Sequence, residues 1–203
     1  MMKKLREKTK RNFFTENYTK SWVYLKESMN FIYIIIGIFL FFSLVGFFIP
    51  VPELMQEKIL DFIKELLNKT EGMSQIDLIK FIFLNNLQSS FSGMIFGFLL
   101  GIFPVMAAIA NGYLLGFVAL ISVDNGGWLI LFKLLPHGIF ELPAIFISLG
   151  LGLKLGTCIF RKEILKNFNE YFINSLRIFL LIVIPLLLIA GIVEGSLIFL
   201  LNS

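Results

Sequence analysis

The fold class is decided by residues 81–123, FIFLNNLQSSFSGMIFGFLLGIFPVMAAIANGYLLGFVALISV, which contain no Asp, Glu, Lys or Arg in 43 positions. A core helix of a soluble protein does not require so long an uncharged run. A bilayer does, since a helix needs about 20 apolar residues to cross its hydrocarbon core. The stretch predicts two membrane crossings, at about 78–100 and 105–123, joined by a short uncharged turn.

The composition of the whole chain supports a membrane protein. Of 203 residues, 57% are hydrophobic and 16% are charged, whereas soluble domains have about 45–50% and about 25%. The single cysteine, Cys158, excludes an internal disulfide and a multi-cysteine metal site. We therefore expect an all-α, polytopic helical protein that has the lipid bilayer as a partner and binds no nucleic acid.

Three further crossings are predicted outside the central stretch, which brings the total to five. They lie at about 30–49, 128–153 and 178–201. Between the first and second, residues 53–71 place apolar side chains at helical spacing opposite charged ones, which predicts an amphipathic helix. In the fourth, Pro136 and Pro143 each suit the first turn of a helix. The sequence therefore predicts a broken fourth span, interrupted at 136–142, and leaves open whether 128–135 is helical or a re-entrant loop.

The distribution of charge predicts the orientation in the cell membrane. Residues 1–29 carry eight Lys or Arg against three Glu, and residues 154–177 carry five against two. Residues 53–80 carry four Lys against six acids. Because cytoplasmic segments are enriched in Lys and Arg, we expect a basic cytoplasmic tail at 1–29 and a cytoplasmic loop at 154–177, the loop lying within a single membrane domain at 30–203. The amphipathic helix and the C-terminus are then extracytoplasmic.

Glycines recur one helical turn apart in three of the predicted spans. Small residues at this spacing let helix backbones approach closely in a membrane. We interpret them as packing positions, and we expect the hairpin 78–123 to be a tight pair. The residues are Gly93, Gly97, Gly101, Gly112, Gly116, Gly152 and Gly156.

Polar and ionisable residues inside the spans are the candidate functional residues, because they are costly in lipid. Lys133, His137 and Glu141 share the fourth span, and Glu194 is expected in solvent near the outer interface. His137 and Glu141 are four positions apart, so they can share a helix face and could begin a metal site. Because a metal site needs a third ligand and Glu194 is the only intramembrane acid left to supply it, a buried structural pair is favoured over a metal site or an intramembrane hydrolase. We expect no enzyme activity, no cofactor and no bound metal. A polar core is predicted from Asn85, Asn86, Asn111, His137 and Glu141.

Four motifs resemble the stage II sporulation protein M family. They are LNNLQSSF at 84–91, GFLLGIFP at 97–104, NGYLLG at 111–116 and LPHGIFELPAIFISLGLGLKLG at 135–156. The resemblance implies a multi-pass membrane protein without catalysis of its own. In spore formers the namesake anchors an engulfment complex with peptidoglycan-degrading partners, and relatives also occur in archaea.

Three functions are therefore open. The first is a membrane scaffold that holds protein partners in a complex, as the resemblance implies. The second is a small-solute or ion transporter or channel, which would use the polar core and would require a homo-oligomer because the chain is short. The third is an intramembrane metal-dependent enzyme using His137 and Glu141.

Overall fold

A computed structural model describes residues 2–49, 53–128 and 131–202. Within these ranges the chain is helical and contains no strand, so the predicted all-α class is confirmed. The helices are α1 (Met2–Phe48), α2 (Glu53–Thr70), α3 (Gln75–Ile95), α4 (Ile102–Gly126), α5 (Leu131–Gly156), α6 (Ile164–Ile178) and α7 (Ile184–Asn202).

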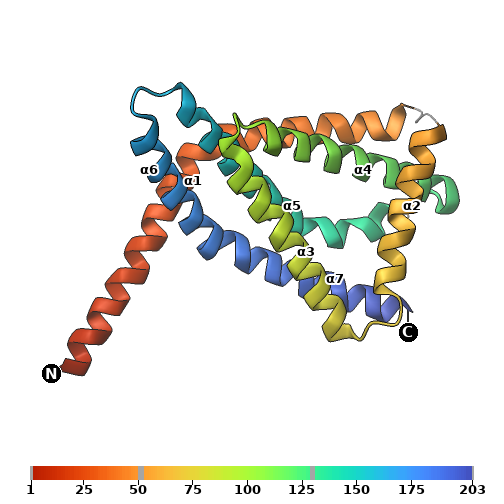
Figure 1. Cartoon of the computed structure of the whole chain (residues 1–203). Coiled ribbons are helices and arrows are strands. Elements are labelled where there is room, and N and C mark those ends of the chain that lie inside the picture. The colour runs from red at the N-terminus through yellow and green to blue at the C-terminus, as the bar shows by residue number, and fades with distance from the viewer. Residues whose placement is uncertain (1, 50–52, 129–130, 203) are drawn as a thin grey trace.

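Four of the described helical segments are long and apolar enough to cross a membrane. They are Thr15–Phe48, Ile102–Gly126, Gly138–Phe160 and Ile164–Leu200. The predicted crossing at 78–100 is not among them, because α3 carries a polar run at 85–90 that lowers its mean hydropathy. Figure 1 nevertheless shows α3 running diagonally alongside these helices, from one end of the bundle to the other.

Two predicted element boundaries fall inside continuous helices. α1 extends without interruption through the expected boundary at 29/30, and in Figure 1 its N-terminal part projects beyond the bundle. At the other end of the chain, a π-helical turn at Phe179–Val183 joins α6 to α7. Much of the segment predicted as a cytoplasmic loop is therefore helical, and it leads directly into the last span.

The predicted break in the fourth span is not observed. α5 is assigned as helix from Leu131 through both prolines to Gly156, and Figure 1 shows that it bends along its length. A proline removes one backbone donor and kinks a helix. A bend preserves the remaining backbone hydrogen bonds, which a full break at membrane depth would leave unsatisfied.

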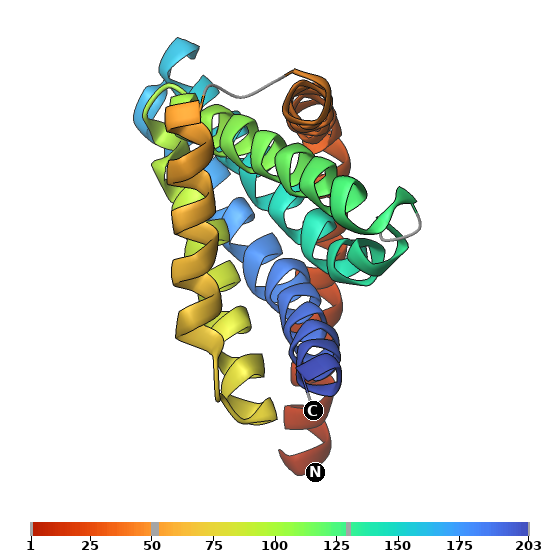
Figure 2. The ribbon, with the colours of Figure 1, turned by 90° about the vertical axis from the view of Figure 1, so that its right-hand side faces the viewer.

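The amphipathic helix predicted at 53–71 is observed as α2. It runs across the end of the bundle at which α1 and α4 finish (Figure 2). Ile59 and Ile63 are half-buried, whereas the charged side chains of Glu57, Lys58 and Asp61 are exposed. The charged side chains of α2 are therefore more exposed than the isoleucines on its apolar stripe.

Glycines set the closest helix contacts, although not within the predicted hairpin. A Cβ atom added to Gly152 of α5 would lie 2.5 Å from the carbonyl oxygen of Gly93. Gly97 likewise meets the backbone of Gly152, and Gly156 meets that of Gly97 and Gly101. The glycines of the second span thus pack on α5 and not on α4.

The glycines of α4 pack against α1 instead. Gly112 meets the backbone of Phe39, and Gly116 meets the backbone of Ser43. The expected tight pair at 78–123 is therefore replaced by two other pairs, α3 with α5 and α1 with α4. The short turn at 96–101 joins α3 to α4, but the glycines of these two helices do not pack against each other.

Candidate functional site

A pocket of about 780 Å³ lies between α1, α4, α5 and α7. Most of its described lining is apolar and comes from one face of each helix. On α4 the lining residues recur at helical spacing, and α5 contributes the residues around its bend. The apolar lining consists of Phe39, Leu114, Leu115, Val118, Ala119, Gly138, Ile139, Leu142 and Ile145.

Four polar side chains complete the described lining. They are Ser43 from α1, Asn111 from α4, Glu141 from α5 and Glu194 from α7. The Asn111 Nδ2 atom donates a hydrogen bond to the carbonyl of Ala107 at 2.9 Å, so the amide oxygen serves as an acceptor. Both carboxylates are half-buried. The described lining contains two acids and no Lys, Arg or His, and both acids have interaction partners of their own.

A buried apolar cluster lies one helical turn from the pocket. Ile35, Ala108 and Leu149 are 0%, 0% and 2% exposed and contact one another across α1, α4 and α5. Each lies within four residues of a lining residue on its own helix. We call these three residues the apolar seal. The pocket therefore lies on the α2 side of the seal.

Among the predicted polar-core residues whose side chains the structure describes, those on α4 and α5 line the pocket and those on α3 do not. Asn111 and Glu141 line the same pocket. On α3, Asn85 is exposed and Asn86 is buried, and neither is among the described lining residues. The side chains of His137 and Lys133 lie outside the described residues, so their predicted roles stay predictions. Among the described residues no group of three His, Cys, Asp or Glu could hold a metal ion.

Glu194 lies in the pocket, although the sequence led us to expect it in solvent at the outer interface. Its position on α7 brings it to the same cavity as Glu141, 53 positions earlier in the chain. A lone acid inside an apolar span is a signal for a functional site. The sequence offered that signal, but it did not show which helix faces which.

A second polar cluster lies on the other side of the seal and was missed. Lys154 at the end of α5 is 6% exposed. Its Nζ atom donates to the Ser28 hydroxyl at 3.0 Å and lies 3.6 Å from the ring centre of Tyr24. The ring of Tyr171 is 5.4 Å away, and a Glu27 oxygen is 3.9 Å away. A buried ammonium thus links α1, α5 and α6.

The structure has the features of a polytopic protein of the membrane-spanning type. It has four long apolar helices, close helix contacts at glycines and acidic side chains between helices. The sequence pattern of the family described as stage II sporulation protein M matches residues 34–197. The chain belongs to this family, and the resemblance found in the sequence is confirmed.

A relative fits the expectation that the family reaches the archaea. An uncharacterized protein of Methanocaldococcus jannaschii is 31% identical over 148 residues, which cover 66% of this chain and 62% of that protein. The match thus spans less than two thirds of the relative's length. No solved structure matches the chain.

Proposed function

We propose that the chain is an integral membrane protein with five crossings, in which α3 is the fifth. α3 supports this count because it runs between the two ends of the bundle (Figure 1). Its polar run faces other helices in part, since Asn86 and Ser90 are buried. The N-terminus is then cytoplasmic and the C-terminus extracytoplasmic.

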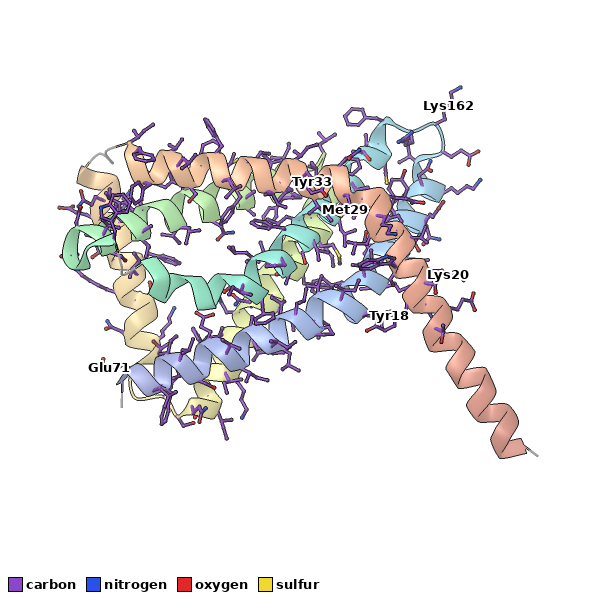
Figure 3. All side chains as sticks on the ribbon, turned by 180° about the vertical axis from the view of Figure 1, so that it is seen from behind. Tyr18, Lys20, Met29, Tyr33, Glu71 and Lys162 are labelled. Carbon is purple, nitrogen blue, oxygen red and sulfur yellow. The ribbon has the colours of Figure 1, made fainter. Side chains whose placement is uncertain are left out.

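The charges at the two ends support this orientation. Figure 3 shows Lys162 at the end from which the basic N-terminal part of α1 projects, and Glu71 at the opposite end. The positive-inside rule assigns the Lys162 end to the cytoplasm. Single cysteines at these two exposed positions, in a Cys158→Ser background, test it in whole cells. A membrane-impermeant maleimide should label Glu71→Cys and not Lys162→Cys, and the reverse pattern contradicts the orientation.

The function we propose is that of a membrane scaffold which holds protein partners, as in the family's namesake. One observation carries it, namely that α2 lies across the end of the bundle opposite Lys162, with its charged side chains exposed. Phe62 is 50% exposed in the midst of these charges. Aromatic side chains, Phe among them, are enriched in protein–protein interfaces relative to the rest of the protein surface.

Capture of partners by affinity purification after crosslinking tests the scaffold. Deletion of residues 53–72 should abolish capture while the bundle remains folded, and Phe62→Ala should reduce it. Phe160→Ala is the matched control, because Phe160 is equally aromatic and is 79% exposed at the other end. Undiminished capture after the deletion would contradict a role for α2.

A second candidate function, transport of a small solute or ion, is favoured by the pocket. Asn111 and Glu141 were predicted as members of one polar core, and both line the cavity. If water reaches it from outside, Asn111→Cys in the Cys158→Ser background should react with an impermeant thiol reagent. Ala144→Cys is the control, since Ala144 on α5 is fully buried. Equal, slow labelling of both would remove the aqueous path.

A further inference from the structure

We infer that the chain forms a homodimer in the membrane, in which the exposed face of α3 packs against the same face of a second copy. The inference rests on the proposed five crossings, because it requires α3 to lie in the bilayer. It depends on three properties of this face, namely its polarity, its depth in the membrane and its ability to pair with itself.

The two faces of α3 differ in exposure. One face packs mainly on α5 and α7, and Figure 1 shows α3 at the front of the bundle, where no other described helix covers its second face. The buried residues are Leu78, Ile82, Asn86, Ser90, Gly93 and Met94. The exposed residues in the second half of the helix are Leu84, Asn85, Gln88, Ser89 and Phe91. Both sets recur at helical spacing, so the exposed set forms one continuous face, which we call the α3 stripe.

Three polar side chains make the α3 stripe unsuited to contact with lipid. They are the carboxamides of Asn85 and Gln88 and the hydroxyl of Ser89, and none of them has a hydrogen-bond partner within the described part of the chain. In hydrocarbon an unpaired carboxamide is costly, because no water replaces its lost hydrogen bonds. The exposed side chains of Leu188 and Ile192 on neighbouring α7 are apolar, so the polarity is particular to α3.

The polar groups lie at the middle of the proposed crossing. α3 has 21 residues, Gln75–Ile95, and at about 1.5 Å per residue its length is close to the ~30 Å thickness of the hydrocarbon core. Asn85 is the central residue, and Gln88 and Ser89 follow within about one helical turn. Their short side chains therefore lie far from both headgroup regions when α3 crosses the bilayer.

A second copy of the chain supplies the missing partners. A carboxamide carries donors on its nitrogen and an acceptor on its oxygen, so two identical groups can pair with each other. A two-fold axis along the membrane normal brings the centres of both α3 helices to the same depth. Interhelical hydrogen bonds hold helices together in membranes, and a small residue such as Ser89 lets the backbones approach. A partner of another kind would need matching polar groups at that depth, whereas a second copy has them by symmetry.

Disulfide crosslinking in isolated membranes tests the interface. Ser89→Cys, which keeps both carboxamides, is compared with Leu188→Cys, each in a Cys158→Ser background. Leu188 is 46% exposed and lies at a similar depth, because α7 packs through Gly191 on Phe83 of α3. We expect oxidation to give a covalent dimer of Ser89→Cys and none of Leu188→Cys.

Three results of this experiment would overturn the inference. The first is no covalent dimer from either variant, and the second is an equal yield from both. The third is rapid reaction of Ser89→Cys with a membrane-impermeant maleimide, since the α3 stripe would then line water instead of a second copy.

Energy transfer between labelled copies measures the strength of the dimer. Donor and acceptor dyes are attached at Glu71→Cys in the Cys158→Ser background, and the ratio of protein to lipid is varied in liposomes. Asn85→Leu with Gln88→Leu should weaken dimerisation at least tenfold, because leucine suits lipid but forms no side-chain hydrogen bond. Asn125→Leu, the same substitution at the exposed end of α4, should leave it unchanged. No association at any ratio, or an unchanged dimer in the double variant, would overturn the inference.

The topology experiment separates failure of this inference from failure of the five-crossing count. With α3 as a crossing, Glu71 and Lys162 lie on opposite sides of the membrane, and the impermeant maleimide labels only one of Glu71→Cys and Lys162→Cys. Without α3 as a crossing, the two lie on the same side and are labelled alike, which overturns the count and the inference with it. If only one is labelled and no dimer forms, the count stands and the inference fails.

Discussion

The contact between α3 and α5 leads to a prediction about stability. In Gly152→Ala the new Cβ atom would lie 2.5 Å from the Gly93 carbonyl oxygen and 3.0 Å from the Met94 Cα atom. Ordinary contacts of a Cβ atom are 3.4 Å or longer, so the two backbones must separate by about 0.9 Å. Both neighbouring atoms belong to the backbone of a helix, so no flexible side chain can move aside.

The magnitude follows from two opposing effects. Overpacking a close contact costs about 1–3 kcal/mol, and replacing glycine by alanine within a helix stabilises by about 0.5–1 kcal/mol. The difference is roughly 0–2.5 kcal/mol, and because the clash is with backbone atoms we expect Gly152→Ala to lower the free energy of unfolding by an amount in the upper half of that range. Gly37→Ala is the matched control, because no atom lies within 4 Å of its added Cβ. It should be neutral or slightly stabilising.

Unfolding in mixed micelles, with increasing sodium dodecyl sulfate and far-UV circular dichroism as the readout, measures both variants. The midpoint for Gly152→Ala should shift to lower denaturant, and that for Gly37→Ala should not. If Gly152→Ala proves as stable as the control, then the backbones of α3 and α5 are not in the close contact that we describe.

Three further predictions concern single side chains. Ser28→Ala removes the hydrogen-bond acceptor of the buried Lys154 ammonium, so it should lower the free energy of unfolding by about 1.5–3 kcal/mol in the same titration. Adding Lys154→Met should recover part of that loss. If the effects of the two substitutions are strictly additive, the two side chains are not coupled as we describe. The Lys69 ammonium, which donates a hydrogen bond to Glu65 at 2.8 Å, lowers the pKa of that carboxyl. Its contribution to α2 is present above the ordinary glutamate pKa of about 4.3 and is lost as the pH falls through the lowered pKa. The hydrogen-exchange protection factor of α2, which is the observed rate corrected for the intrinsic exchange rate at each pH, should therefore fall in acid, and it should fall less in Glu65→Gln. Cys158 is 2% exposed and should react with N-ethylmaleimide far more slowly than a cysteine placed at Phe160 in a Cys158→Ser background; equal rates would contradict its burial.

The sequence predicted the helices better than their partners. Apolar runs and periodicity identified the all-helical class and the amphipathic helix at 53–71, because both signals are local. The glycine spacing identified close-packing faces, but spacing along one helix carries no information about the helix opposite. The glycines of α3 therefore meet α5, and a hairpin pairing with α4 was expected wrongly.

The candidate site shows the same limit. Intramembrane cost singled out Asn111 and Glu141 as candidates, since polar groups in a span are expensive whatever surrounds them, and the structure places both at one pocket. The separation of α3 from the pocket depends on the bend of α5 and on which face of each helix turns inward. Lys154 was counted with a basic loop because charge alone does not reveal burial. Its cover comes from Tyr24 and Ser28 of α1 and from Tyr171 of α6.

The apolar seal also has an electrical consequence. A dry layer of hydrocarbon supports most of a membrane potential, because water and ions on either side carry the outside or inside potential up to its edge. In the proposed orientation Glu141 and Glu194 lie on the outer side of that layer, so their carboxylates experience little of the field. Moving an elementary charge past Leu149 would involve about 2.3 kcal/mol for every 100 mV. The two carboxylates should thus be nearly insensitive to voltage, and only passage of charge through the seal should sense it.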